Sequence, residues 1–135
     1  MSKRFIDKVV IVTGAGSGIG QTTAERFAEE GAMVVIAELD KKTGKLAEEN
    51  INKKNNQSKF FETDVSDFNS VNDMVNNTVK YFGPPDVLIN NAGINVFSEP
   101  LKMSDAEWKR AFSVDLDGVW YGCKAVLPHM LEKRK

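Results

Sequence analysis

The chain has 135 residues, enough for one domain with a substantial hydrophobic core. Lys and Arg number 18 and Asp and Glu number 19, so a net charge of −1 gives no electrostatic reason to expect nucleic acid or an anionic membrane as a partner. The single cysteine, Cys123, excludes an internal disulfide and is expected in the core. The N-terminus has no signal-peptide pattern, and no apolar stretch approaches the roughly 20 residues that span a bilayer. We therefore expect a cytoplasmic protein.

Alternating strands and helices are predicted along the chain. Apolar, β-branched runs predict buried parallel strands at residues 8–13, 33–37, 59–63 and 86–90. Apolar residues at helical spacing predict helices at residues 21–30, 42–54 and 67–82. The second helix would bury Leu46, Ala47 and Ile51, and Ser66 would cap the third.

The last part of the chain is predicted to be helical. Ser104 and Glu107 have the spacing of a capping box, and the helical stretch runs from about Asp105 towards Glu132, with a break near residues 116–118. The whole pattern predicts a single α/β domain over residues 1–135. Its expected architecture is a Rossmann-like doubly wound parallel sheet with right-handed crossovers and strand order 3-2-1-4.

A glycine-rich loop joins the first strand to the first helix. Its pattern is T-G-x-x-x-G-x-G, formed by Thr13, Gly14, Gly18 and Gly20. Gly14 permits a sharp exit from the strand, while Gly18 and Gly20 lack side chains where a pyrophosphate and the strand must come close. The helix directs free N–H groups and its positive dipole end at the phosphates, and Ser17 can add a hydroxyl donor. A plain glycine-rich turn is the alternative, which the position between a buried strand and a helix disfavours.

Carboxylates end the second and third strands. Glu38 lies close to the expected spacing of about 20 residues after the glycine loop, where an acidic residue binds the adenosine ribose hydroxyls and repels a 2′-phosphate. NAD is therefore favoured over NADP. Asp40 is an alternative for this role, and Lys41 and Lys42 weaken the discrimination. Asp64 can bind an adenine amino group or form a cap before the next helix.

The fourth strand is followed by Asn90-Asn91-Ala92-Gly93. Asparagine side chains can cross-link neighbouring strand ends, and Ala92 with Gly93 lets the backbone approach a flat sugar or ring. A structural turn is the alternative interpretation, and part of the role is expected to be structural.

The chain resembles the short-chain dehydrogenase/reductase family over essentially its whole length. Four features carry the resemblance, in this order: TGAGSGIG, the acidic end of the second strand, DV after the third strand and LINNAGI after the fourth. The resemblance implies hydride transfer between NAD(P) and an alcohol or carbonyl carbon of a small-molecule substrate, in a homo-oligomer. It implies cofactor contacts of three kinds. These are Gly14, Ser17, Ile19 and Gly20 at the pyrophosphate, Asp64 and Val65 at the adenine, and Asn91, Ala92 and Gly93 at the cofactor ribose.

Two departures from the family pattern bear on activity. Asp115 stands where the family usually has an Asn that holds a water in a proton relay, and an ionised Asp cannot donate a hydrogen bond. The family's catalytic Ser and its Y-x-x-x-K motif are absent, because Pro85 lies four residues after Tyr81 and Ala125 four after Tyr121. We therefore expect an incomplete domain, truncated after the fifth helix and inactive alone, with no metal site.

The alternative function is a non-catalytic dinucleotide-binding or interaction module. The missing Y-x-x-x-K favours the module for this polypeptide, while the cofactor motifs favour an enzyme as its origin. Without a fifth strand, the fourth would expose an edge. The final helix also carries many apolar residues without evident partners, so we expect the isolated chain to be marginally stable. The sequence does not identify a substrate.

Overall fold

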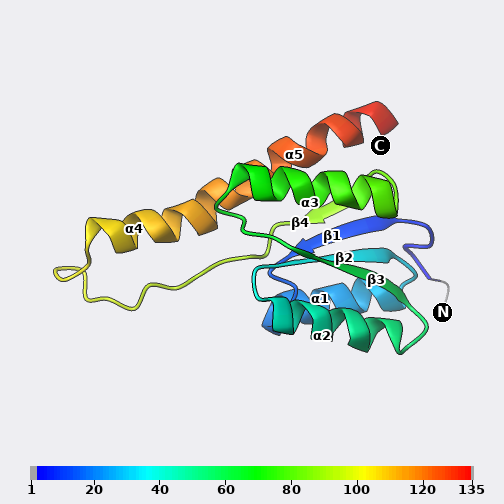
Figure 1. Cartoon of the computed structure of the whole chain (residues 1–135), viewed down its shortest axis with the longest axis horizontal. Helices are drawn as coiled ribbons and strands as arrows, with labels where there is room; N and C mark the ends of the chain where they lie inside the picture. The colour runs from blue at the N-terminus through cyan, green and yellow to red at the C-terminus, as the bar shows by residue number, and fades with distance from the viewer. Residues whose placement is uncertain (1–2, 135) are drawn as a thin grey trace.

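A computed structural model describes residues 3–134; Met1, Ser2 and Lys135, which belong to the predicted 1–135 domain, lie outside the described residues. Figure 1 shows one central sheet between two layers of helices. The strands are β1 (Val9–Thr13), β2 (Met33–Glu38), β3 (Gln57–Glu62) and β4 (Val87–Ile89). All pairs are parallel and the order is β3-β2-β1-β4, which confirms the predicted Rossmann-like topology.

The helices lie on both faces of the sheet. On one face are α1 (Gly18–Glu29) and α2 (Lys41–Asn52), and on the other are α3 (Phe68–Tyr81) and α5 (Gly118–Lys133). The short helix α4 (Asp105–Phe112) lies past the carboxyl ends of the strands (Figure 1). The predicted break before α5 is a π-helical turn, η1 (Ser113–Asp117). Among residues 3–134, no helix has both the length and the apolar character needed to cross a membrane.

Two apolar clusters hold the layers together, because successive strand residues point to opposite faces of a sheet. One cluster joins β1 and β2 to α1 and α2 through Val10, Val12, Val34, Ile36, Ala24, Ala28, Ala47 and Ile51. The other joins the same strands to α3 and α5 through Ile11, Val35, Val71, Met74, Val75, Ala125 and Val126. Continuous apolar runs in β1 and β2 are thus explained by burial on both faces.

Three local predictions were wrong. Leu46 is 53% exposed, because the buried stripe of α2 is centred on Gly44, Ala47 and Ile51. The cap of α3 is Asp67, whose carboxylate accepts the N–H of Asn69 at 3.0 Å. The hydroxyl of Ser66 instead donates to the carboxylate of Asp64.

The third wrong prediction concerns Cys123 of α5. Its side chain is half-buried beside the end of β4 and does not lie in the core. Its Sγ accepts a hydrogen bond of 3.6 Å from Nδ2 of Asn90. Gly122 lies directly against the same asparagine, because a Cβ at this position would meet Asn90 Oδ1 at 2.5 Å. The close approach of α5 to the strand end therefore brings the thiol to the polar loop.

Candidate cofactor-binding site

A cavity of about 560 Å³ opens where the strands end. Its walls come from the glycine loop, the ends of β2, β3 and β4 with the loops that follow them, and the stretch from α4 into η1. Every residue that the sequence assigned to cofactor binding lines this cavity: Gly14, Ser17, Gly18, Ile19, Gly20, Glu38, Asp64, Val65, Asn91, Ala92 and Gly93. The structure thus brings together residues that are as much as 79 positions apart in the chain.

The glycine loop has the backbone conformation that its sequence predicts. Gly14 and Gly18 have φ angles of +64° and +54°, in the left-handed region that side chains disfavour. A Cβ at Gly14 would lie 2.9 Å from the Cα of Ala92, so the loop after β4 packs directly on this glycine. A Cβ at Gly18, which lines the cavity, would meet nothing within 4 Å, so the space beside this residue is open.

No side chain caps the N-terminus of α1. Asp40, Asp67 and Ser104 accept backbone N–H groups at the starts of α2, α3 and α4, whereas Ser17 makes no such bond at α1. The first turn of α1 also carries no acidic residue. Its first N–H groups and the positive end of its dipole are therefore left for an anion in the cavity.

A polar cross-link joins the end of β1 to the loop after β4. The hydroxyl oxygen of Thr13 accepts the backbone N–H groups of Asn91 and Ala92, both at 3.0 Å. The Asn91 amide nitrogen donates to the carbonyls of Thr13 and Gly14 at 3.0 and 3.3 Å. A Cβ at Gly20 would collide with the Gly14 carbonyl and this amide. The predicted cross-linking role of the asparagine is confirmed, and the cross-link forms a rigid cavity floor.

Glu38 and Asp40 have different environments. The Glu38 carboxylate lines the cavity and accepts the N–H groups of Gly16 at 2.9 Å, Leu39 at 3.0 Å and Asp40 at 3.2 Å. Asp40 caps α2 instead, and the N–H of Thr43 that it accepts holds the pKa of its carboxyl below the usual value. The cavity therefore contains Glu38 and not the alternative residue.

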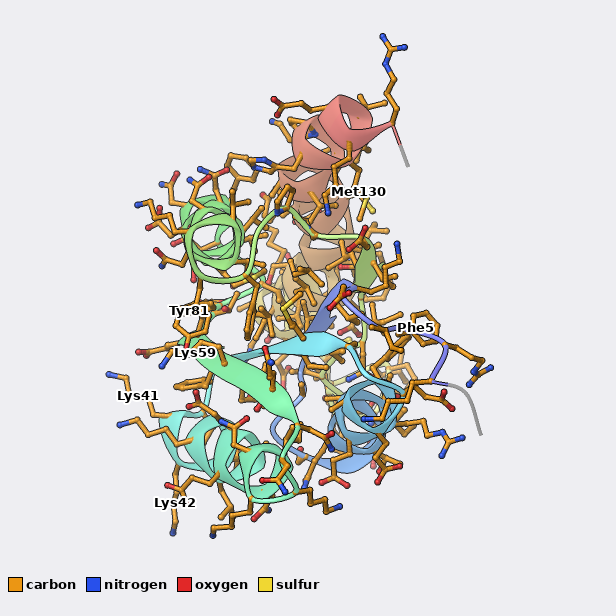
Figure 2. The ribbon with its side chains drawn as sticks, turned by 90° about the vertical axis from the view of Figure 1, so that its right-hand side faces the viewer. Phe5, Lys41, Lys42, Lys59, Tyr81 and Met130 are labelled. Atoms are coloured by element: carbon orange, nitrogen blue, oxygen red, sulfur yellow. The ribbon has the colours of Figure 1, made fainter. Side chains whose placement is uncertain are left out.

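The two lysines after Asp40 do not line the cavity. Lys41 forms an ion pair with Glu62 at 3.1 Å. Figure 2 shows Lys41 and Lys42 projecting from the outer side of α2 towards solvent. Neither ammonium group belongs to the cavity lining that contains Glu38, and their effect on the choice between NAD and NADP stays a prediction.

The loop after β3 forms one side wall. The Asp64 carboxylate accepts the backbone N–H of Ser66 at 2.9 Å and its hydroxyl at 2.6 Å, so the loop is a tight turn around this group. Val65 is 8% exposed and packs against the start of α5, since a Cβ at Gly118 would lie 3.0 Å from its Cγ2. This contact fixes the distance between the side wall and the helical stretch opposite.

Asp115 lies in the π-helical turn and is not among the residues that line the cavity. Its Oδ1 accepts the backbone N–H of Ile94 at 2.9 Å, so it anchors the loop that carries Asn91 and Gly93. The side-chain oxygen of an asparagine could accept the same N–H. This hydrogen bond can therefore be made by Asp as well as by the family's usual Asn.

Sequence reasoning missed part of the cavity wall. Arg110, Ser113 and Val114 face the cavity from α4 and η1. Their spacing of three and four residues places them on one helix face, but every helix has residues at this spacing, so it carried no signal that this face lines the cavity. Tyr121 and Lys124, which lie close together in α5, do not line the cavity. The centroids of the Tyr121 and Phe68 rings are 5.6 Å apart, and the Lys124 ammonium lies 4.8 Å from the Phe68 centroid.

Known proteins are similar to this chain in both sequence and fold. The family model for short chain dehydrogenase matches residues 8–135. Meso-2,3-butanediol dehydrogenase of Serratia marcescens is 40% identical over 131 residues, which cover 97% of this chain and 51% of that protein. An uncharacterized oxidoreductase of Thermotoga maritima is 40% identical over 130 residues, which cover 93% and 49%.

A solved structure gives the same result. The crystal structure of a short-chain dehydrogenase/reductase from Burkholderia phymatum in complex with NAD is similar with a TM-score of 0.94 at 30% identity, over 100% of this chain and 48% of that chain. The chain belongs to the short-chain dehydrogenase family. It spans about half the length of the relatives that it matches.

Proposed function

We propose that this chain forms the dinucleotide-binding part of an oxidoreductase that transfers hydride between NAD(H) and an alcohol or carbonyl carbon of a small molecule. The main support is the cavity, in which the glycine loop, an uncapped helix N-terminus and two carboxylates converge at the strand ends. When bound, the nicotinamide ring supplies the hydride or accepts it. The described residues fit such a ligand, because Gly18 leaves open space where a phosphate approaches the helix.

Each part of the cavity has a proposed partner in the cofactor. The diphosphate lies at the free N–H groups of the first turn of α1, with the hydroxyl of Ser17 as a further donor. The adenosine ribose hydroxyls donate to Glu38, the adenine lies at Asp64 and Val65, and the remaining ribose lies against residues 91–93. Glu38 accepts three backbone N–H groups, and its two oxygens offer about four lone-pair sites, so capacity for a ribose hydroxyl remains.

Selectivity for NAD over NADP is tested at Glu38. Glu38→Ala removes the negative charge that repels a 2′-phosphate, so the ratio of the two dissociation constants should move towards one by about tenfold or more. Calorimetric titration of the chain with NAD and with NADP measures this ratio. Glu49→Ala, which removes an exposed carboxylate on α2 outside the cavity, is the matched control and should leave the ratio unchanged. An unchanged ratio in the Glu38 variant would remove this residue from the selectivity role.

The chemical step needs more than these residues supply. A carbonyl that receives hydride needs a proton donor, and the chain contains no Tyr followed by Lys four positions later. We expect the 135-residue chain to bind NAD weakly and to turn over no alcohol, and measurable turnover by the pure chain would contradict this. The alternative is a non-catalytic dinucleotide-binding or interaction module. Sequencing the gene beyond the codon for residue 135 separates the two, because an in-frame Y-x-x-x-K there identifies an enzyme.

The complete protein is proposed to be a cytoplasmic homo-oligomer. The support is an apolar surface on α4, η1 and α5, where Trp108, Leu116, Trp120 and Leu131 are 56–66% exposed. Exposed apolar side chains at helical spacing along α4, η1 and α5 are typical of an interface between subunits. Light scattering of the complete protein gives its mass, and Trp120→Glu should reduce it to that of a smaller species. A monomeric complete protein would contradict the proposal.

A further inference from the structure

Arg110 is the one cationic residue among the described residues that line the cavity. The other charged residues there, Glu38 and Asp64, are both acidic and both already accept hydrogen bonds from the protein. None of the ion pairs among residues 3–134 involves Arg110, and its only hydrogen bonds there use its backbone. A planar guanidinium with its donors unused therefore faces a cavity proposed for an adenine dinucleotide.

The position of Arg110 indicates which part of such a ligand it meets. Gly118 lies against Val65, and Val114 and Arg110 precede it by one and two helical turns on the cavity side. Because the Gly118 end of this helix face packs on the loop after β3, we infer that Arg110 approaches the cavity from the side of residues 63–66, which line the same cavity. The N-terminus of α1, which is proposed to bind the diphosphate, comes from the opposite face of the sheet to α5.

We propose that Arg110 contacts the adenine ring of the bound dinucleotide, with its guanidinium plane packed on the base; this rests on the function proposed above. The guanidinium is weakly hydrated and stacks readily on aromatic faces, which a lysine ammonium does less well. Asp64 then meets the amino edge of the base while Arg110 covers its face. The two charges act on different parts of one aromatic ring system.

The helix that carries Arg110 is held in place by few contacts. α4 buries no residue and packs mainly against η1. The Asp115 bond to Ile94 and the Ser113 hydroxyl bond to the Arg110 carbonyl, at 2.9 and 2.7 Å, fix the turn that follows it. A base contact by Arg110 therefore gives α4 a ligand-dependent connection to the rest of the cavity.

The test compares binding of three ligands to the full chain by calorimetry: NAD, adenosine monophosphate and nicotinamide mononucleotide. Arg110→Met should weaken NAD and adenosine monophosphate by about fivefold each and leave nicotinamide mononucleotide unchanged, since that ligand has no adenine. Lys109→Met, which removes the neighbouring cation outside the cavity, should change none of the three. Arg110→Lys separates base from phosphate: a base contact predicts weakening close to that of Arg110→Met.

Three results would overturn the inference. If Arg110→Lys binds like the unmodified chain, the guanidinium serves as a simple charge for a phosphate and not as a platform for the base. If Arg110→Met leaves adenosine monophosphate binding unchanged while the unmodified chain binds it, the inference alone falls. If the unmodified chain binds none of the three ligands, the proposed function falls and the inference falls with it. A thermal melt of each variant establishes that it is folded, which is expected because Arg110 is exposed.

Discussion

Asp86, which begins the segment leading into β4, is predicted to be a major determinant of stability. Its side chain is 8% exposed. Its carboxylate accepts the backbone N–H of Val9 at 2.9 Å and the ammonium of Lys133 at 3.3 Å, with Lys8 at 3.9 Å. It therefore joins the starts of β1 and β4 to the end of α5. Burial raises the pKa of this carboxyl, but the Val9 bond and the lysines outweigh burial and leave the pKa below its usual value.

Asp86→Ala should lower the free energy of unfolding by about 2 kcal/mol, because a hydrogen bond to a charged group contributes roughly 1.5–3 kcal/mol and the Val9 N–H loses its partner. For 135 residues the unfolding entropy is about 0.3 kcal/mol per kelvin, so the melting temperature should fall by about 7 °C. Thermal unfolding followed by circular dichroism at pH 7 measures this. Asp73→Ala, which removes an exposed carboxylate on α3, is the control and should shift the melting temperature far less.

The same carboxyl predicts a pH dependence. A folded-state pKa below the unfolded value means that the stabilisation is complete above about pH 4 and is lost as the pH falls through the folded pKa. The difference between the unmodified chain and Asp86→Ala should therefore be full at pH 7 and become smaller below about pH 4. A difference under 2 °C at pH 7, or one that grows on acidification, would refute the role assigned to this group.

Two further predictions concern the cavity floor and its loop. Thr13→Val replaces the hydroxyl that accepts the N–H groups of Asn91 and Ala92 with a methyl group of similar size, and should cost about 2 kcal/mol in urea unfolding, whereas Thr13→Ser should cost much less. Equal losses for Val and Ser would argue that packing and not the hydroxyl matters. Asp115→Ala should destabilise by about 1 kcal/mol and speed amide exchange at Ile94, while Asp115→Asn, which keeps the acceptor, should do neither. Slow exchange at Ile94 in the alanine variant would contradict this anchoring role.

The sequence predicted the sheet and most of the cavity because their signals are local. Apolar runs fix the buried strands, and the glycine spacing fixes the loop between β1 and α1. The choice between Glu38 and Asp40 could not be made in this way, because both are acidic and two residues apart, and only the start of α2 at Lys41 assigns Asp40 to a cap. The same ambiguity explains Asp67 in place of Ser66, since both residue types cap helices well.

Arg110 was missed for a different reason. Its place in the cavity wall depends on the contact between Gly118 and Val65 and on the π-helical turn that follows α4. Neither is visible in hydrophobic periodicity, which predicted only a break in the helix. The predicted burial of Leu46 was wrong because an apolar residue next to the buried stripe of a helix fits the same periodic pattern and can still be exposed to solvent.

The absence of a side chain at Gly20 links two positions that are remote in the chain. The amide of Asn91 occupies the space that a Cβ at residue 20 would need, so neither position can be enlarged without displacing the other. Their substitutions should therefore be partly non-additive, because shortening Asn91 relieves one clash of a side chain at residue 20 while the clash with the Gly14 carbonyl remains. Anyone redesigning the mouth of this cavity for a bulkier ligand has to treat residues 14, 20 and 91 as one site, and to vary them together in a library.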